Sequence, residues 1–274
     1  GFTYMLAAVR WWLLLQVQNI VVRFRVIAAL TLVGQFFNAF MLGSIGGDIV
    51  KALYLHRYAP NQRTHATLSV VIDRGLGLFV LLCGSLLAIP WLIGSMLNSQ
   101  HVEAAIIGIV VAFTVLVAGA LAMSCMPFHR APPVLRQFWN KVPYHRVIEL
   151  VVSGFRQHGV ALRWTLASVA AAIAVVLMLN FAAYCIALGI GLDVSYLQLL
   201  VILTVAICVT SLSISIGGHG VREGAFVLMF AVFGVVTVDR GAVGGQETAI
   251  LFSLLFFAVP LVWSLAGGVI YLTF

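Results

Sequence analysis

A short stretch of this chain combines glycines with a cation, an acid and a histidine inside otherwise apolar sequence. It runs Ile216-Gly217-Gly218-His219-Gly220-Val221-Arg222-Glu223-Gly224. Arg222 is suited to binding a phosphate, with Glu223 as its partner or as a coupling acid, and His219 can titrate near neutrality. The glycines predict a break in the helix, and broken backbone survives in a membrane only where protein buries it or a wet cavity adjoins it. Ionisable groups at that depth indicate a functional site.

A similar stretch lies upstream. Ile45-Gly46-Gly47-Asp48-Ile49-Val50-Lys51 aligns without gaps with Ile216–Arg222, at a constant offset of 171 residues from Gly46 to Gly217. Glycine-broken apolar segments in corresponding places of two halves predict an internal repeat, with one central cavity between the halves that Lys51 and Arg222 share. A chance match between short glycine-rich runs is the alternative.

The other polar residues near the upstream glycines have expected partners. Asp48 and Lys51 are three residues apart and share a helix face, so Asp48 is expected to hold Lys51 or Arg74. The free N–H groups beside Gly46 and Gly47 could cradle an anion. Asn38 is expected to bond exposed backbone at the break. Asp73 and Arg74 are expected to form an ion pair near the headgroups.

For the downstream motif the sequence leaves two interpretations open. Adjacent residues on a helix point about 100° apart, so Arg222 and Glu223 need not pair with each other. They serve a binding site, or they form structural ion pairs with Asp48 or Lys51. His219 has a structural alternative as well, a hydrogen-bonded histidine in a turn.

The composition predicts a polytopic helical membrane protein. Of the 274 residues, 63% are hydrophobic and only 8% are charged, and the mean hydropathy is +1.13. The apolar runs are long and continuous, which favours α-helices over a β-barrel. We expect one integral membrane domain over 1–274, with about six to eight membrane segments, two of them glycine-broken or re-entrant, and an inverted repeat. The four cysteines are scattered and read as packing residues.

Charge divides the chain and predicts its orientation. The halves 1–123 and 164–274 flank a basic loop, 124–163, that carries six Lys and Arg residues and an amphipathic helix. The positive-inside rule places this loop in the cytoplasm, and the formal charge of +7 suits a membrane surface better than nucleic acid.

These residues resemble a known family. The run from Phe37-Asn38 through Gly46-Gly47-Asp48, then Asp73-Arg74, then Gly217 to Gly224, is similar to the membrane domain of bacterial lysylphosphatidylglycerol synthases and its stand-alone flippase-like relatives. The resemblance implies an inner-membrane protein that moves anionic, aminoacylated or isoprenoid-type lipids between leaflets. It further implies that one N-terminal helix is missing, that the soluble synthase domain is absent, and that Lys51 replaces a more usual Arg.

The expected function is therefore a lipid translocase working through a polar cavity, with a membrane lipid as partner. An intramembrane enzyme using His219 and Glu223 on a lipid headgroup, or a non-transporting partner of a lipid synthase, are the alternatives. No catalytic motif, metal site or cofactor site is recognised. The expected substrate-binding residues are Asn38, Gly46, Gly47, Asp48, Lys51, Asp73, Arg74, Gly217, Gly218, His219, Gly220, Arg222 and Glu223.

Overall fold

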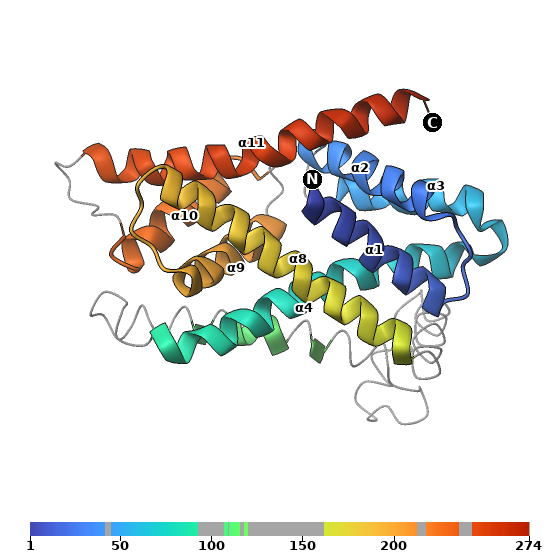
Figure 1. Cartoon of the computed structure of the whole chain (residues 1–274), viewed down its shortest axis with the longest axis horizontal. Helices are drawn as coiled ribbons and strands as arrows, with labels where there is room; N and C mark the ends of the chain where they lie inside the picture. The colour runs from blue at the N-terminus through green and yellow to red at the C-terminus, as the bar shows by residue number, and fades with distance from the viewer. Residues whose placement is uncertain are drawn as a thin grey trace, which may run out of the picture.

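The computed structural model describes residues 1–41, 45–92, 107–108, 110–115, 118–119, 162–212, 218–235 and 243–273. Helices make up nearly all of these residues, and no strand occurs among them (Figure 1). The predicted helical fold is confirmed, while the predicted basic loop lies almost entirely outside the described residues. The elements are α1 (Phe2–Val17), α2 (Phe24–Phe40), α3 (Gly46–Tyr58), η1 (Pro60–Gln62), α4 (Arg63–Leu92), α8 (Leu162–Gly189), α9 (Tyr196–Leu212), α10 (Val221–Val232) and α11 (Val243–Thr273).

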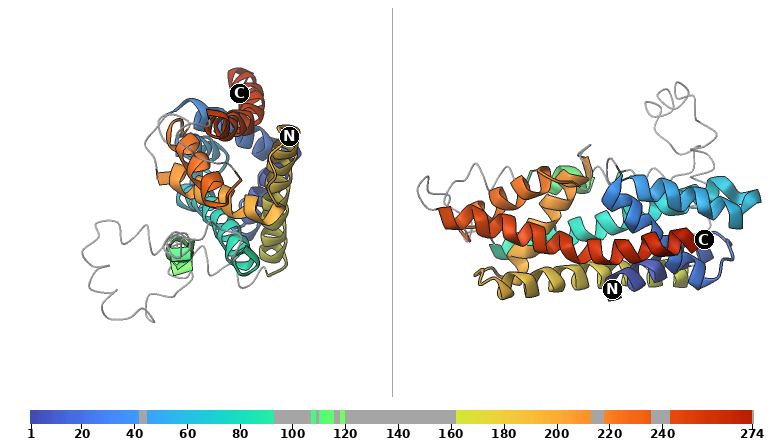
Figure 2. Two further views of the ribbon diagram at one scale, coloured as in Figure 1. Left: turned by 90° about the vertical axis from the view of Figure 1, so that its left-hand side faces the viewer. Right: turned by 90° about the horizontal axis from the view of Figure 1, so that it is seen from above.

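The helices have the lengths and surfaces of a membrane protein. Segments Arg63–Leu92, Arg163–Gly189 and Gly245–Thr273 are each long and apolar enough to cross a bilayer. Large apolar side chains on their outer faces are exposed, as in Leu87, Trp91 and Leu272. Such contiguous apolar surface would be unstable in water but is stable against acyl chains. Most helices run roughly along the long axis of the molecule and are seen nearly end-on when viewed down it (Figure 2).

Two helical hairpins each have one short arm. α3 has 13 residues and α10 has 12, or about 20 Å at 1.5 Å per residue, against about 30 Å for a bilayer core. α3 packs on α2, and α10 packs on α9. The same order of helices therefore occurs twice, in α1–α4 and again in α8–α11. In each set the third helix is short and the fourth has about 30 residues.

The two halves exchange packing partners. α4 packs on α9, α11 packs on α2, and α1 packs on α8 with the opposite chain direction (Figure 1). Ser85 and Thr204 hydrogen-bond across the α4–α9 contact. In the α11–α2 contact, a Cβ built on Gly267 would lie 2.0 Å from the carbonyl oxygen of Leu32, so the backbones touch directly. Small residues permit such close approach between helices in membranes.

Exposed arginines gather at one end of the molecule. The start of α2, the end of α3, the start of α4 and the start of α8 lie on the right of Figure 1. The exposed arginines at or beside these helix ends are Arg23, Arg25, Arg57, Arg63 and Arg163. The described residues at the other end, around Asp193 and the start of α11, include no Lys or Arg. Arg163 also stacks on Trp164, and the Trp164 ring packs edge-on against Trp12. Aromatic and cationic side chains of this kind are typical of a membrane interface.

Candidate functional site

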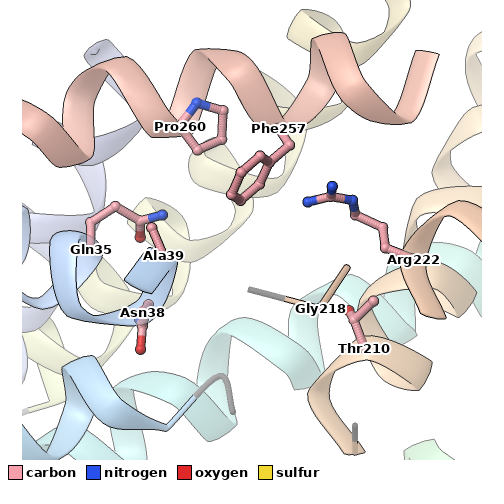
Figure 3. A pocket seen from close by; sticks show the side chains of 8 residues that line it. All are labelled: Gln35, Asn38, Ala39, Thr210, Gly218, Arg222, Phe257 and Pro260. Atoms are coloured by element: carbon pink, nitrogen blue, oxygen red, sulfur yellow. The ribbon is translucent and has the colours of Figure 1, made fainter. Parts of the chain in front are cut away.

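A cavity of about 180 Å³ lies where the two halves meet (Figure 3). Four helices and the turn before α10 surround it, so both hairpins and the long helix α11 contribute side chains. The cavity is lined by Gln35, Asn38 and Ala39 of α2, Thr210 of α9, Gly218, Arg222 of α10, and Phe257 and Pro260 of α11. Arg222 is the charged member of this set, and the amides of Gln35 and Asn38 stand opposite it.

The guanidinium of Arg222 is held by three neighbours. Its Nε donates to Ser253 Oγ at 3.0 Å, and its Nη2 donates to Glu223 Oε1 at 2.7 Å. The guanidinium carbon lies 4.4 Å from the centre of the Phe257 ring. These contacts fix the orientation of the forked guanidinium group, and its Nη1 takes part in neither hydrogen bond. Arg222 is only 8% exposed, so its charge acts in a poorly solvated space.

Glu223 has a structural role beside its charge. Its carboxylate accepts a hydrogen bond from the N–H of Gly220, which caps the start of α10, and its Oε1 lies 3.8 Å from His219 Nδ1. The structure therefore pairs Arg222 with its sequence neighbour, and the expected alternative pairing with Asp48 or Lys51 is wrong. The carboxylate cap at the helix start turns Glu223 back toward Gly220 and brings it beside Arg222.

The upstream motif builds a separate ion network. Asp48 contacts Lys51 Nζ at 3.7 Å and also accepts a hydrogen bond from Arg74, so Asp48 holds both of its expected partners. The stem of Lys51 crosses Gly34, where a Cβ would lie 2.4 Å from Lys51 Cε. The ammonium then lies 5.5 Å from the centre of the Trp11 ring.

Lys51 is not among the residues that line the cavity with Arg222, contrary to expectation. Asp48 and the Trp11 ring hold its ammonium on the side of α2 that faces α1. The two cations of the aligned motifs therefore do not share one cavity: Arg222 lines the cavity, and Lys51 lies beside Asp48 and Trp11.

Asp73 pairs with Arg10 and not with Arg74. Arg10 Nε and Nη2 donate to the two carboxylate oxygens of Asp73 at 2.6 and 2.9 Å. Side chains of adjacent helical residues diverge, so Asp73 faces α1 while Arg74 reaches Asp48 on α3. The sequence did not identify Arg10 as a partner of Asp73, because the run Arg10-Trp11-Trp12 has the composition of an anchor at the membrane interface. A cation inside an apolar helix was the signal that could have identified it.

Asn38 connects the upstream glycines to the cavity. Its Oδ1 accepts a hydrogen bond from the N–H of Gly47 at 2.8 Å, as the sequence predicts for an amide beside broken backbone. A Cβ on Gly47 would lie 1.9 Å from the carbonyl oxygen of Gly34, and Gly46 packs against Met41. The start of α3 is thereby pressed against α2, next to the cavity wall.

The downstream glycines shape the opposite wall. Gly218 and Gly220 have φ values of +76° and +82°, a conformation that side chains other than glycine rarely adopt. Gly218 lines the cavity itself, whereas Gly217 lies outside the described residues. Among the described residues no cluster of three or more His, Cys, Asp or Glu side chains could hold a metal ion. The cavity presents hydrogen-bond donors suited to an anion, namely the Arg222 guanidinium and the amides of Gln35 and Asn38.

Comparison with known protein families gives a match over most of the chain. Residues 1–267 match the family described as the lysylphosphatidylglycerol synthase TM region, in agreement with the resemblance seen in the sequence. No curated protein and no solved structure matches the chain significantly.

Proposed function

Because the chain belongs to the family of lysylphosphatidylglycerol synthase transmembrane regions, we propose that it is a lipid translocase that moves an anionic phospholipid between leaflets. Aminoacylated and isoprenoid-type phospholipids share the phosphate that the proposal requires. The observation that carries the proposal is the cavity at the meeting of the two halves, with the Arg222 fork fixed at its wall.

The balanced charge of the cavity suits a substrate that binds and is then released. Glu223 neutralises Arg222 at 2.7 Å, which lowers the cost of burying the guanidinium when no lipid is bound. A phosphate entering the cavity meets the remaining N–H groups of the fork and the amides of Gln35 and Asn38. Acyl chains can remain in the bilayer, beside the exposed apolar faces of the long helices.

The two hairpins are proposed to be re-entrant units of an inverted repeat. Their short arms, α3 and α10, support this because helices of about 20 Å cannot cross the bilayer core. The opposite directions of α1 and α8 support the inversion (Figure 1). In the described part of the chain, the proposed membrane segments are the three long helices, the shorter apolar helices α1, α2 and α9, and the two re-entrant arms, which makes eight.

The arginine-rich end is proposed to face the cytoplasm of a bacterial inner membrane. Arg23, Arg25, Arg57, Arg63 and Arg163 support this through the positive-inside rule, since no described Lys or Arg lies at the other end. The basic loop joins α8 at this same end of the molecule.

Chemistry on the lipid headgroup is less well supported. A general base needs a carboxylate or imidazole that is free to take a proton. Glu223 instead accepts hydrogen bonds from Arg222 and from the Gly220 N–H, both of which stabilise its ionised form.

The proposal is tested in proteoliposomes that contain a fluorescent phosphatidylglycerol, with a membrane-impermeant quencher reporting its leaflet. Wild type should equilibrate the lipid, while Arg222→Gln should slow exchange at least tenfold in protein that a cooperative melting transition shows to be folded. Arg25→Gln at the exposed end of α2 is the matched control and should behave as wild type. Equal exchange in Arg222→Gln and wild type would refute the proposal, and a changed headgroup in the recovered lipid would establish the enzyme instead.

A further inference from the structure

A second cavity, of about 250 Å³, lies on the other side of α9, and we infer that it is a separate binding site for a phosphate-type anion. The inference extends the proposed function, although anion binding here does not depend on the cavity at Arg222. Four helices build it: α1, α4, α8 and α9. Its polar lining is Arg10, Arg74, Gly77 and Ser211, and its apolar lining is Leu78, Leu81, Val175, Val176, Leu179 and Ile207.

The ion network beside this cavity joins side chains of α1, α3 and α4. Among the described residues, Arg10 pairs with Asp73, and Lys51 and Arg74 both contact Asp48. Two guanidinium groups of this network, those of Arg10 and Arg74, line the cavity. An anion that enters the cavity is attracted to both, because the surrounding protein and lipid screen charge poorly.

Arg10 is held so that one nitrogen stays available. Its Nε and Nη2 are engaged by Asp73 through two hydrogen bonds, and Nη1 takes part in neither. Nη1 lies over Gly77, where a Cβ would approach it to 2.7 Å. The glycine therefore leaves room for the guanidinium on α4, while Asp73 fixes its direction. A preorganised fork of this kind is suited to phosphate oxygens.

The cavity also has the chemistry for a phosphate that carries an apolar group. Val175, Val176 and Leu179 of α8 and Ile207 of α9 form a wall beside the two guanidinium groups. Ser211 of α9 lines this cavity, and its neighbour Thr210 lines the first one. The last turn of α9 therefore separates the two cavities, so an anion can occupy either without displacing the other. A lipid phosphate and free inorganic phosphate both have the required charge, and an experiment can separate them.

The site is tested by protection of an introduced cysteine. The Leu179→Cys variant is made in the full chain with its native cysteines replaced, and it is purified in maltoside micelles without phosphate. The rate of its alkylation by a small maleimide is measured without added ligand and then in the presence of dioctanoyl phosphatidylglycerol, dioctanoylglycerol or inorganic phosphate. Leu177→Cys, exposed on the same helix and absent from the cavity wall, is the matched control.

Dioctanoyl phosphatidylglycerol should slow alkylation of Leu179→Cys about tenfold, corresponding to occupancy near 90%. Protection by inorganic phosphate would also support the anion site, with free phosphate as its ligand. Equal protection by dioctanoylglycerol would show an apolar groove only and would overturn the inference, as would no protection by any probe. The Leu177→Cys control should react at one rate throughout.

Two further variants separate this site from the proposed function. Arg222→Gln should leave protection of Leu179→Cys unchanged even if lipid exchange stops, because the cavities are distinct. Loss of protection in Arg222→Gln would mean one shared site and would overturn the inference. Gly77→Ala should weaken protection by displacing Arg10 Nη1, with melting temperature measured to show that the protein remains folded.

Discussion

Arg10 and Asp73 are 63 residues apart in the chain and form a two-point ion pair, with nitrogen–oxygen distances of 2.6 and 2.9 Å. Each residue is only 8% exposed. The pair fastens α1 to α4 beside the second cavity, and Trp11 adds a hydrogen bond from its indole nitrogen to Ser69 one turn away on α4. An arginine placed in this way positions a helix and offers a donor to a ligand at once.

Removing the acid of this pair should be costly. Asp73→Asn leaves the Arg10 guanidinium buried with a neutral partner, which typically destabilises a protein by about 3–5 kcal/mol. Thermal unfolding in detergent should show a clearly lower melting temperature, while the control Arg25→Gln at an exposed position should stay within about 0.5 kcal/mol of wild type. If the double variant Arg10→Gln/Asp73→Asn is no more stable than the sum of the single variants predicts, the two residues are not coupled.

Asp48 should matter more for stability than its partner Lys51. Asp48→Asn withdraws the shared carboxylate from Lys51 and Arg74 together, whereas Lys51→Gln leaves the contact between Asp48 and Arg74 in place. The melting temperature should therefore fall further for Asp48→Asn than for Lys51→Gln. The opposite order would show that the cation stacked on Trp11 dominates the network.

Glycines at helix contacts should respond differently from a glycine with open space around it. Gly47→Ala and Gly267→Ala place a Cβ 1.9 and 2.0 Å from backbone oxygens, so the helices must separate, at a typical cost of about 1–3 kcal/mol. Gly224→Ala in α10 meets nothing within 4 Å and should raise stability by about 0.5–1 kcal/mol. Melting temperatures of the three variants, measured side by side, check the packing directly. Equal effects at all three positions would contradict it.

The two ends of the molecule should label from opposite sides of the membrane. With the native cysteines replaced, Asp193→Cys should react with a membrane-impermeant maleimide in intact cells, and Arg25→Cys should react only after the membrane is permeabilised. Arg25 is exposed in the first turn of α2, and Asp193 is exposed in the connection between α8 and α9, so both positions are accessible to the reagent. The reverse pattern would invert the proposed orientation.

The sequence predicted the class of fold and part of the local chemistry. Long apolar runs predict helices whatever the packing of those helices. The partners of Asn38 and Asp48 could also be predicted because they lie nearby in the chain: Asn38 bonds Gly47 in the same hairpin, and Asp48 contacts Lys51 one turn away and Arg74 on the next helix. Arg10 could not be assigned, because its partner depends on how α1 meets α4. The pairing of Arg222 with Glu223 was one of the alternatives that the sequence left open, and the carboxylate cap on Gly220, which helix spacing alone does not reveal, decides it.

The exchange of packing partners between the halves has a mechanical consequence. Since α4 rests on α9 and α11 rests on α2, neither half buries its own contact faces by itself. The halves are interlocked, so a protease cut between α4 and α8 should leave two fragments that copurify. For the same reason, either fragment expressed alone should be degraded, while the two expressed together should reassemble.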